Sequence, residues 1–176
     1  MSIKWFDNVR SVNEDVVDRI LSQWDEVAPH LDVSAMSVIG RVSRLSRLID
    51  RQLAENFAEH GIDNWMYDVL ATLRRSGAPF ELSPGELVEQ TMVTTGAMTN
   101  RVDRLIERGF VERSHSDTDR RRVNVRLTDT GRDLVDTVAP HHYALEARLL
   151  GSVTISQQQT LASTLRTVLL DLGDTA

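Results

Sequence analysis

The residues with the clearest chemistry lie between positions 94 and 108. Four short polar side chains come first, Thr94, Thr95, Thr99 and Asn100, and the arginines Arg101, Arg104 and Arg108 follow. An asparagine amide can pair with adenine through two hydrogen bonds, and a threonine methyl group can contact thymine. Arginine can bind phosphates, which fix register without carrying sequence information. The segment therefore predicts a surface that reads base edges in the major groove of double-stranded DNA, with a polar solvent-facing helix side as the competing interpretation.

A second basic cluster follows. Arg120, Arg121 and Arg122 are consecutive within a polar stretch, Ser114–Arg122. A narrow minor groove concentrates negative potential and favours inserted arginine, so Arg120 and Arg121 are predicted to bind DNA. Asp119 is predicted to orient the Arg121 guanidinium through charge-assisted hydrogen bonds. The alternative is a disordered charged loop.

The charge distribution agrees with these two clusters. The chain carries a net charge of −6, but residues 94–132 hold nine arginines and six acidic residues. That segment has a balance of +3, which leaves −9 for the rest of the chain. Since phosphate contacts need a locally positive surface, an acidic protein can still bind DNA.

Composition excludes several other classes of protein. The chain has 176 residues, 41% of them hydrophobic and 26% charged, which favours one soluble domain over residues 1–176. It has no cysteine, so disulfides and thiolate metal sites are excluded. No apolar stretch reaches the length of a membrane span, and residues 1–10 do not resemble a signal peptide. We therefore expect a cytoplasmic protein with no membrane partner.

An enzyme is not indicated. The chain has no glycine-rich nucleotide loop, and its five histidines show no metal-site spacing. His141 and His142 are adjacent and diverge by about 100° on a helix, while His30, His60 and His115 are scattered. We expect no catalytic residue, metal or cofactor. A dimerising adaptor without DNA binding is the other alternative, and the threonine and arginine clusters argue against it.

The spacing of apolar residues and the residues typical of helix ends predict which helices and strands carry these side chains. Three amphipathic helices are predicted at 13–28, 34–60 and 63–76. Ser83 and Glu86 form a predicted capping box that opens a short helix through Gln90. After a break at 91–93, Thr94 or Thr95 caps another helix that ends at Gly109. Two such helices joined by a short turn predict a helix-turn-helix.

The second half predicts a wing and two further helices. Residues 110–113 and 123–127 are predicted strands that flank the arginine-rich wing. Thr128 caps a helix through Leu150 that should kink at Pro140, and Ser156 with Gln159 is predicted to open the last helix. The fold class is thus mainly α with a small β-hairpin wing. We expect residues 62–127 to form the DNA-binding lobe, and the apolar helices in 13–60 and 128–172 to form a homodimerisation region.

Several of these segments together resemble a known family. They are residues 96–105, the Gly-Phe-Val-Glu-Arg run at 109–113, Asp119-Arg120-Arg121, and Leu-Thr-Asp-Thr-Gly at 127–131. The chain is similar to the MarR family from about residue 34 to 172. The resemblance implies a homodimer of winged helix-turn-helix lobes that binds a pseudo-palindromic operator, usually as a repressor, and releases it when a small molecule binds.

The N-terminal helix resembles the urate-responsive branch of that family, which includes PecS- and HucR-type regulators. That branch implies four effector-binding residues, which in this sequence are Trp24, Asp68, Arg101 and Arg113. A purine anion needs arginine donors for its oxygens, and it needs an aromatic or apolar wall. The expected effector is urate or a related purine. The alternatives are a different small aromatic ligand or none, with Trp24 in a core, Asp68 paired with Arg113, and Arg101 on a phosphate.

Overall fold

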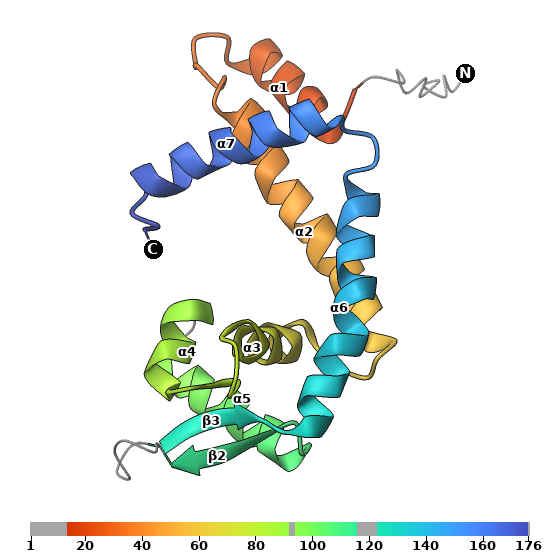
Figure 1. The fold of residues 1–176 in the computed structure, drawn as a ribbon. Helices are drawn as coiled ribbons and strands as arrows, with labels where there is room; N and C mark the ends of the chain where they lie inside the picture. Colours follow the sequence, from red (N-terminus) through yellow and green to blue (C-terminus); the bar gives the residue numbers. More distant parts are fainter. Residues whose placement is uncertain (1–13, 92–93, 116–122, 176) are drawn as a thin grey trace, which may run out of the picture. The chain divides into compact units, whose positions relative to one another are not determined.

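The computed structural model describes residues 14–91, 94–115 and 123–175, and the wing residues Asp119, Arg120 and Arg121 lie outside them. Within these ranges the chain forms helices and a small sheet (Figure 1). The helices are α1 (Val16–Val27), α2 (Met36–Ala58), α3 (Asn64–Arg75), α4 (Pro84–Thr91), α5 (Thr95–Glu107), α6 (Asp129–Leu149) and α7 (Ile155–Asp171). The strands are β1 (Glu81–Leu82), β2 (Val111–His115) and β3 (Val123–Leu127). Two compact units divide the chain, one ending at Arg51 and the other starting at Gln52.

The first unit contains α1 and most of α2. Asp15 caps α1 and forms a capping box with Asp18. From α2, Arg41 donates to the Asp15 carboxylate at 2.8 Å and to the Asp18 carboxylate at 2.6 Å. Val17 is buried and lies against Gly40, where an added Cβ would meet its methyl group at 3.3 Å. These contacts join the start of α1 to α2.

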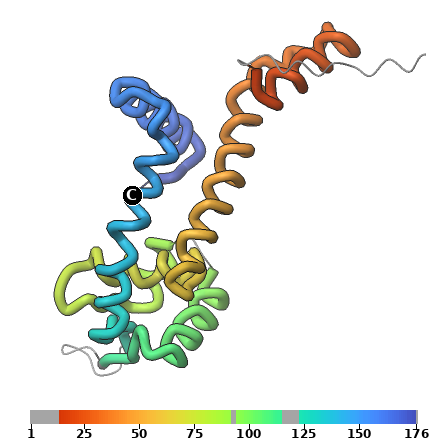
Figure 2. Tube along the Cα trace, turned by 90° about the vertical axis from the view of Figure 1, so that its right-hand side faces the viewer, coloured from red at the N-terminus to blue at the C-terminus, as the bar shows by residue number. Residues whose placement is uncertain are grey.

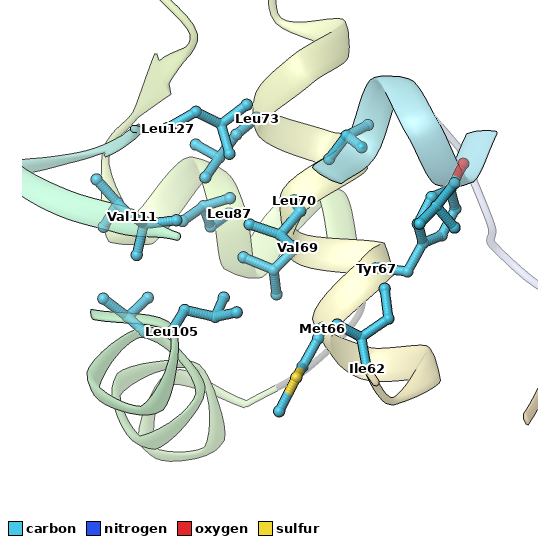
Figure 3. Packing of buried hydrophobic residues seen from close by; sticks show 14 of the residues in the cluster. Ile62, Met66, Tyr67, Val69, Leu70, Leu73, Leu87, Leu105, Val111 and Leu127 are labelled. Atoms are coloured by element: carbon cyan, nitrogen blue, oxygen red, sulfur yellow. The ribbon is translucent and has the colours of Figure 1, made fainter. Parts of the chain in front are cut away.

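The second unit is built on a buried apolar cluster. Val69, Leu70 and Leu73 of α3 are fully buried at its centre. Leu87 of α4 and Leu105 of α5 pack against them, with Val111 and Leu127 from the sheet, as Figure 3 shows. Because each element of the helix-turn-helix and the wing contributes to one core, the surface residues of these elements hold fixed positions relative to one another.

The sheet has the order β1-β3-β2 with antiparallel pairing throughout. Strand β2 pairs with β3 from Val111 opposite Leu127 to His115 opposite Val123. This pair is the base of the predicted wing, and β2 begins one residue later and ends two residues later than the predicted strand at 110–113. Strand β1 was not predicted from the sequence. Figure 2 shows β2 and β3 beside the helix-turn-helix of the second unit.

Most helix ends follow their expected capping residues. The Ser83 N–H donates to the Glu86 carboxylate at 2.8 Å, which confirms that capping box, and Thr94 and Thr128 cap α5 and α6. The prediction for the last helix was wrong. Thr154 is the cap of α7, and its capping-box partner is Gln157. Ser156 lies inside the first turn instead. Among the described residues, no helix combines the length and apolar character that a membrane crossing requires.

Candidate DNA-binding surface and effector residues

Helix α5 presents the predicted base-reading residues on its exposed side. Met98, Val102 and Leu105 are buried along the inner side. The outer side holds five predicted DNA-contacting residues that are all exposed, Thr94, Thr95, Thr99, Asn100 and Arg104. The inner residues recur at helical spacing, so burying them turns the polar residues towards solvent.

Hydrogen bonds within α5 divide these side chains into two groups. The Thr94 hydroxyl accepts from the Ala97 N–H at 3.4 Å, and the Thr99 hydroxyl donates to the Thr95 carbonyl at 3.1 Å. These contacts hold the first turn of the helix and fix the threonine rotamers. Within the described part of the chain, Asn100 and Arg104 make no such bond. Their amide and guanidinium are therefore available to an external partner.

Arg108 is committed to the fold. Its Nη1 donates to the Gly61 carbonyl at 2.9 Å, and its guanidinium lies 4.9 Å from the centre of the Phe110 ring. These contacts join the end of α5 to the segment before α3. Arg108 thus has a structural role in the described part of the chain.

The base of the wing is held by a residue that the sequence did not single out. Glu81 of β1 accepts a hydrogen bond from the Ser114 hydroxyl at 2.9 Å and one from the Asn124 amide at 3.2 Å. Ser114 belongs to β2 and Asn124 to β3. A separate exposed pair joins Glu112 and Arg126 at 2.7 Å across the same two strands. Only knowledge of the β1 pairing could have pointed to Glu81.

Two of the four predicted effector residues lie within electrostatic reach of each other. Burial raises the pKa of the Asp68 carboxyl, and Arg101 and Arg75 oppose this shift. The Arg101 guanidinium lies 5.7 Å from the centre of the Trp65 ring. Desolvation outweighs both arginines, so Asp68 is protonated over a wider pH range than an exposed aspartate.

The other two predicted effector residues are placed differently. Arg113 of β2 pairs with Asp103 of α5 at 2.6 Å, so the ion pair considered between Arg113 and Asp68 is replaced by this one. Trp24 lies on α1 in the first unit and is 41% exposed, so it is not a core residue of the single chain. Both side chains therefore remain accessible from outside.

Trp65 is an aromatic residue in the first turn of α3. In the structure it is half-buried and lines an open pocket of about 250 Å³ with Ala97, Asn100, Arg101 and Arg104. Its indole N–H donates to the Asp63 carboxylate at 3.2 Å. The pocket thus combines one aromatic face with two guanidinium groups of α5.

Two histidines from distant parts of the sequence meet in the structure. His60 and His141 are far apart in sequence, but their ring nitrogens lie 3.2 Å apart and the rings are stacked. The neighbouring His142 turns elsewhere, as its helical position requires, and pairs with Glu146 at 3.2 Å. Within the described residues, no group of three or more side chains that could hold a metal ion is formed.

Comparison with known proteins agrees with this arrangement. The sequence model of the MarR family matches residues 60–122. The HTH-type transcriptional regulator PecS of Dickeya dadantii is 39% identical over 149 residues, which span 85% of this chain and 90% of PecS. The chain belongs to the MarR family. It is therefore a DNA-binding transcriptional regulator, and its relatives are regulators rather than enzymes.

Solved MarR structures share the fold. A cysteine-to-serine mutant of MarR from E. coli, solved in complex with operator DNA, superposes with a TM-score of 0.67 at 28% identity, covering 83% of this chain and 97% of that one. AbsC from Streptomyces coelicolor has a TM-score of 0.75 at 21% identity, over 82% of this chain and 98% of AbsC. The MarR-family winged helix-turn-helix is thus established for this chain.

Proposed function

We propose that this MarR-family regulator binds a pseudo-palindromic operator as a homodimer, acts as a repressor, and is released by urate or a related purine. In this proposal residues 62–127 form the DNA-binding lobe, and residues 13–60 and 128–172 form the dimerisation region. The observation that carries it is the outer side of α5, where the Asn100 and Arg104 end groups have no partner among the described side chains. A relative has been solved with operator DNA bound.

Exposed apolar side chains support the homodimer. In the first unit, the α2 residues Val38, Ile39, Val42, Leu45 and Leu48 are between 44% and 63% exposed. In the second unit, α7 exposes Leu161, Val168, Leu169 and Leu170 in the same way. Monomeric proteins rarely leave contiguous apolar surface of this kind in water. A second copy of the chain would cover it, and a two-fold axis would match a pseudo-palindrome.

The electrostatics around Asp68 support an anionic effector. A charged carboxylate would repel urate, and burial, which raises the pKa of Asp68, acts in the direction that lessens this repulsion. Arg101 lies on the same helix as the base-reading residues. A ligand that binds Arg101 and Arg113 more tightly in the free protein than in the DNA complex would shift the equilibrium towards free protein. Trp24 is proposed as a further effector residue, the aromatic wall that the family resemblance implies.

The test is a footprint on the intergenic DNA upstream of the protein's own gene, followed by a mobility-shift titration with urate. We expect two protected half-sites about one helical turn apart. Urate should release the DNA at high micromolar to millimolar concentration, which corresponds to about 4–6 kcal/mol of binding. Arg113→Ala should weaken the urate response and keep most of the DNA affinity, because Arg113 lies on β2 rather than on the reading side of α5.

Two controls separate the parts of the proposal. Salicylate should act more weakly than urate, since it lacks a second oxygen edge for a pair of arginines to bind. If the wild type holds its DNA at saturating urate, or if Arg113→Ala responds as the wild type does, the purine site is wrong and the DNA-binding function remains. The effector would then be a different small aromatic ligand, or there would be none.

A further inference from the structure

We propose that Glu81 is a positioning residue for the wing, and that its carboxylate sets the direction in which the wing meets DNA. This rests on the proposed function in one respect, namely that the wing contacts DNA. The carrying observation is the pair of hydrogen bonds that Glu81 accepts at once from β2 and from β3.

The three side chains involved lie on one face of the sheet. Glu81 is opposite Arg126 of β3, and Asn124 lies two residues away on the same strand. Ser114 of β2 is directly opposite Asn124. Side chains two residues apart on a strand, and those directly opposite, share a face. Glu81 therefore reaches across β3 to β2, and each carboxylate oxygen accepts from a different strand, at 3.2 Å and 2.9 Å.

The position of this contact matters because β1 is very short. Strand β1 pairs with β3 only at Arg126 and Val125, so the sheet beyond these residues has two strands. Two-stranded ribbons twist more than larger sheets do. Ser114 and Asn124 lie in that two-stranded part, one residue pair before the described strands end at His115 and Val123. Glu81 thus extends the restraint of a third strand to the base of the wing tip.

Glu81 is itself anchored independently of the wing. The preceding residue, Phe80, has a φ of 62°, a conformation that a bulky residue adopts only where its surroundings hold it. Its carbonyl accepts from the Leu127 N–H at 3.1 Å, and the Arg74 guanidinium lies 4.9 Å from its ring centre. Arg74 is paired with Asp136 of α6 at 2.8 Å. These contacts within the second unit thus hold the backbone immediately before Glu81 in place.

The charge of Glu81 and its proposed positioning role predict opposite changes in DNA affinity when Glu81 is removed. A carboxylate near a DNA-binding wing repels phosphates, so its removal should tighten binding if charge were all that mattered. If Glu81 positions the wing, its removal should weaken binding although a negative charge is lost. The two explanations predict changes in DNA affinity of opposite sign, so a binding measurement distinguishes them.

The experiment compares four variants of the full-length protein on the duplex that the wild type protects. Glu81→Ala removes both acceptors and should weaken binding about tenfold, the factor of one lost charge-assisted hydrogen bond. Glu81→Gln keeps one acceptor and gains a donor for the serine hydroxyl, so it should bind at least as tightly as the wild type. Ser114→Ala removes one of the two contacts and should be intermediate. Glu112→Ala is the matched control, because it removes the same charge from an exposed pair on the same face.

Two further readouts separate positioning from general loss of structure. In the free protein, Glu81→Ala should speed amide hydrogen exchange in β2 and β3 while exchange in α3 and α5 stays unchanged. On DNA, it should remove protection at the flanks that the wing would contact and keep protection at the half-site centres. The exchange measurement needs no DNA, so it stands even if no operator is found.

The proposal is overturned if Glu81→Ala binds as tightly as the wild type, or if Glu81→Gln is as weak as Glu81→Ala. It is also overturned if exchange rises equally in α3 and α5, because Glu81 would then support the whole fold. A Glu112→Ala variant as weak as Glu81→Ala would also overturn it, because the weakening would then not be specific to the residue that bonds to both strands. Failure of the proposed function looks different, because the wild type itself would then give no specific footprint.

Discussion

Gly131 in the first turn of α6 has no space for a side chain. A Cβ at this position would clash with the carbonyl oxygen of Phe110 and would lie 2.9 Å from its carbonyl carbon. The Gly131 N–H also donates to the Thr128 hydroxyl at 3.0 Å, and that hydroxyl donates to the Gly109 carbonyl at 2.8 Å. The start of α6 therefore packs directly against the short connection between α5 and β2.

We expect Gly131→Ala to lower the free energy of unfolding by more than about 2 kcal/mol, since the clash is with backbone rather than with a flexible side chain. Gly96→Ala is the matched control. Gly96 lies in α5 with nothing within 4 Å of a Cβ, so alanine there should raise stability by about 0.4–1 kcal/mol. Urea denaturation followed by circular dichroism measures both. Equal effects of the two substitutions would contradict this account.

Asp68 gives a pH dependence with a defined sign. Its pKa is raised in the folded chain, chiefly by burial, so between the ordinary value of 3.8 and the folded value the native state binds more protons than the unfolded state. Stability therefore falls as pH rises through that window. Asp68→Asn should raise the thermal midpoint at pH 7 and have little effect below about pH 3.8.

Asp15 provides a control of opposite sign. The backbone N–H of Asp18 and the Arg41 side chain lower the pKa of Asp15. Its ionised form therefore contributes stability above its ordinary pKa, and that contribution is lost as pH falls through the folded value. Asp15→Asn should not stabilise the protein at pH 7. A thermal midpoint of Asp68→Asn that is unchanged at neutral pH would show that Asp68 is well solvated.

At the scale of the elements, we expect two side chains of α5 to contribute to DNA binding in different ways, one to base preference and one to phosphate binding. Asn100→Ala should cost about 1–3 kcal/mol on the preferred sequence and relax the preference at one base pair. Arg104→Ala should weaken binding to all sequences alike and reduce the slope of log affinity against log salt by about one unit. Binding titrations on specific and scrambled duplexes at several salt concentrations separate the two. The assignment is wrong if Arg104→Ala changes base preference and Asn100→Ala changes the salt slope.

The elements also show what the sequence could predict. The Ser83 and Glu86 capping box is local, since all its atoms lie within four residues, and it formed as expected. For the last helix, two overlapping pairs fit the same pattern, Thr154 with Gln157 and Ser156 with Gln159, and spacing alone did not distinguish them. Strand β1 is two residues long and pairs with residues more than 40 positions later. A segment this short shows no alternation of apolar and polar residues, so periodicity could not predict it.

The candidate site was partly predictable for the same reason. The reading side of α5 follows from helical spacing, and its five predicted residues are exposed. Contacts between distant segments did not follow from spacing. They include Glu81 with Ser114, Arg101 over Trp65, and His60 against His141. Each joins residues at least 30 positions apart, and their proximity depends on the packing of whole elements.

At the scale of the whole molecule, one charge introduced on α7 should disrupt the expected homodimer. Leu169 of α7 is 48% exposed in the single chain, so Leu169→Glu should leave the chain folded and disrupt a homodimer that buries it. Light scattering should give about twice 19.8 kDa for the wild type and 19.8 kDa for the variant. Gln159→Glu, at an exposed polar position of the same helix, should stay dimeric. A monomeric wild type that binds an asymmetric site would refute the assembly.

The short connection between α5 and β2 has a consequence for the choice of operator. Only Arg108, Gly109 and Phe110 separate the helix from the strand, and Leu105 and Val111 anchor its two sides in one core. The helix that would enter the major groove and the strands β2 and β3 at the base of the wing are therefore held at a fixed spacing. A fixed spacing of this kind would favour DNA in which neighbouring major and minor grooves lie at the matching distance. DNA with a different groove spacing would bind more weakly even where every contacted base is correct.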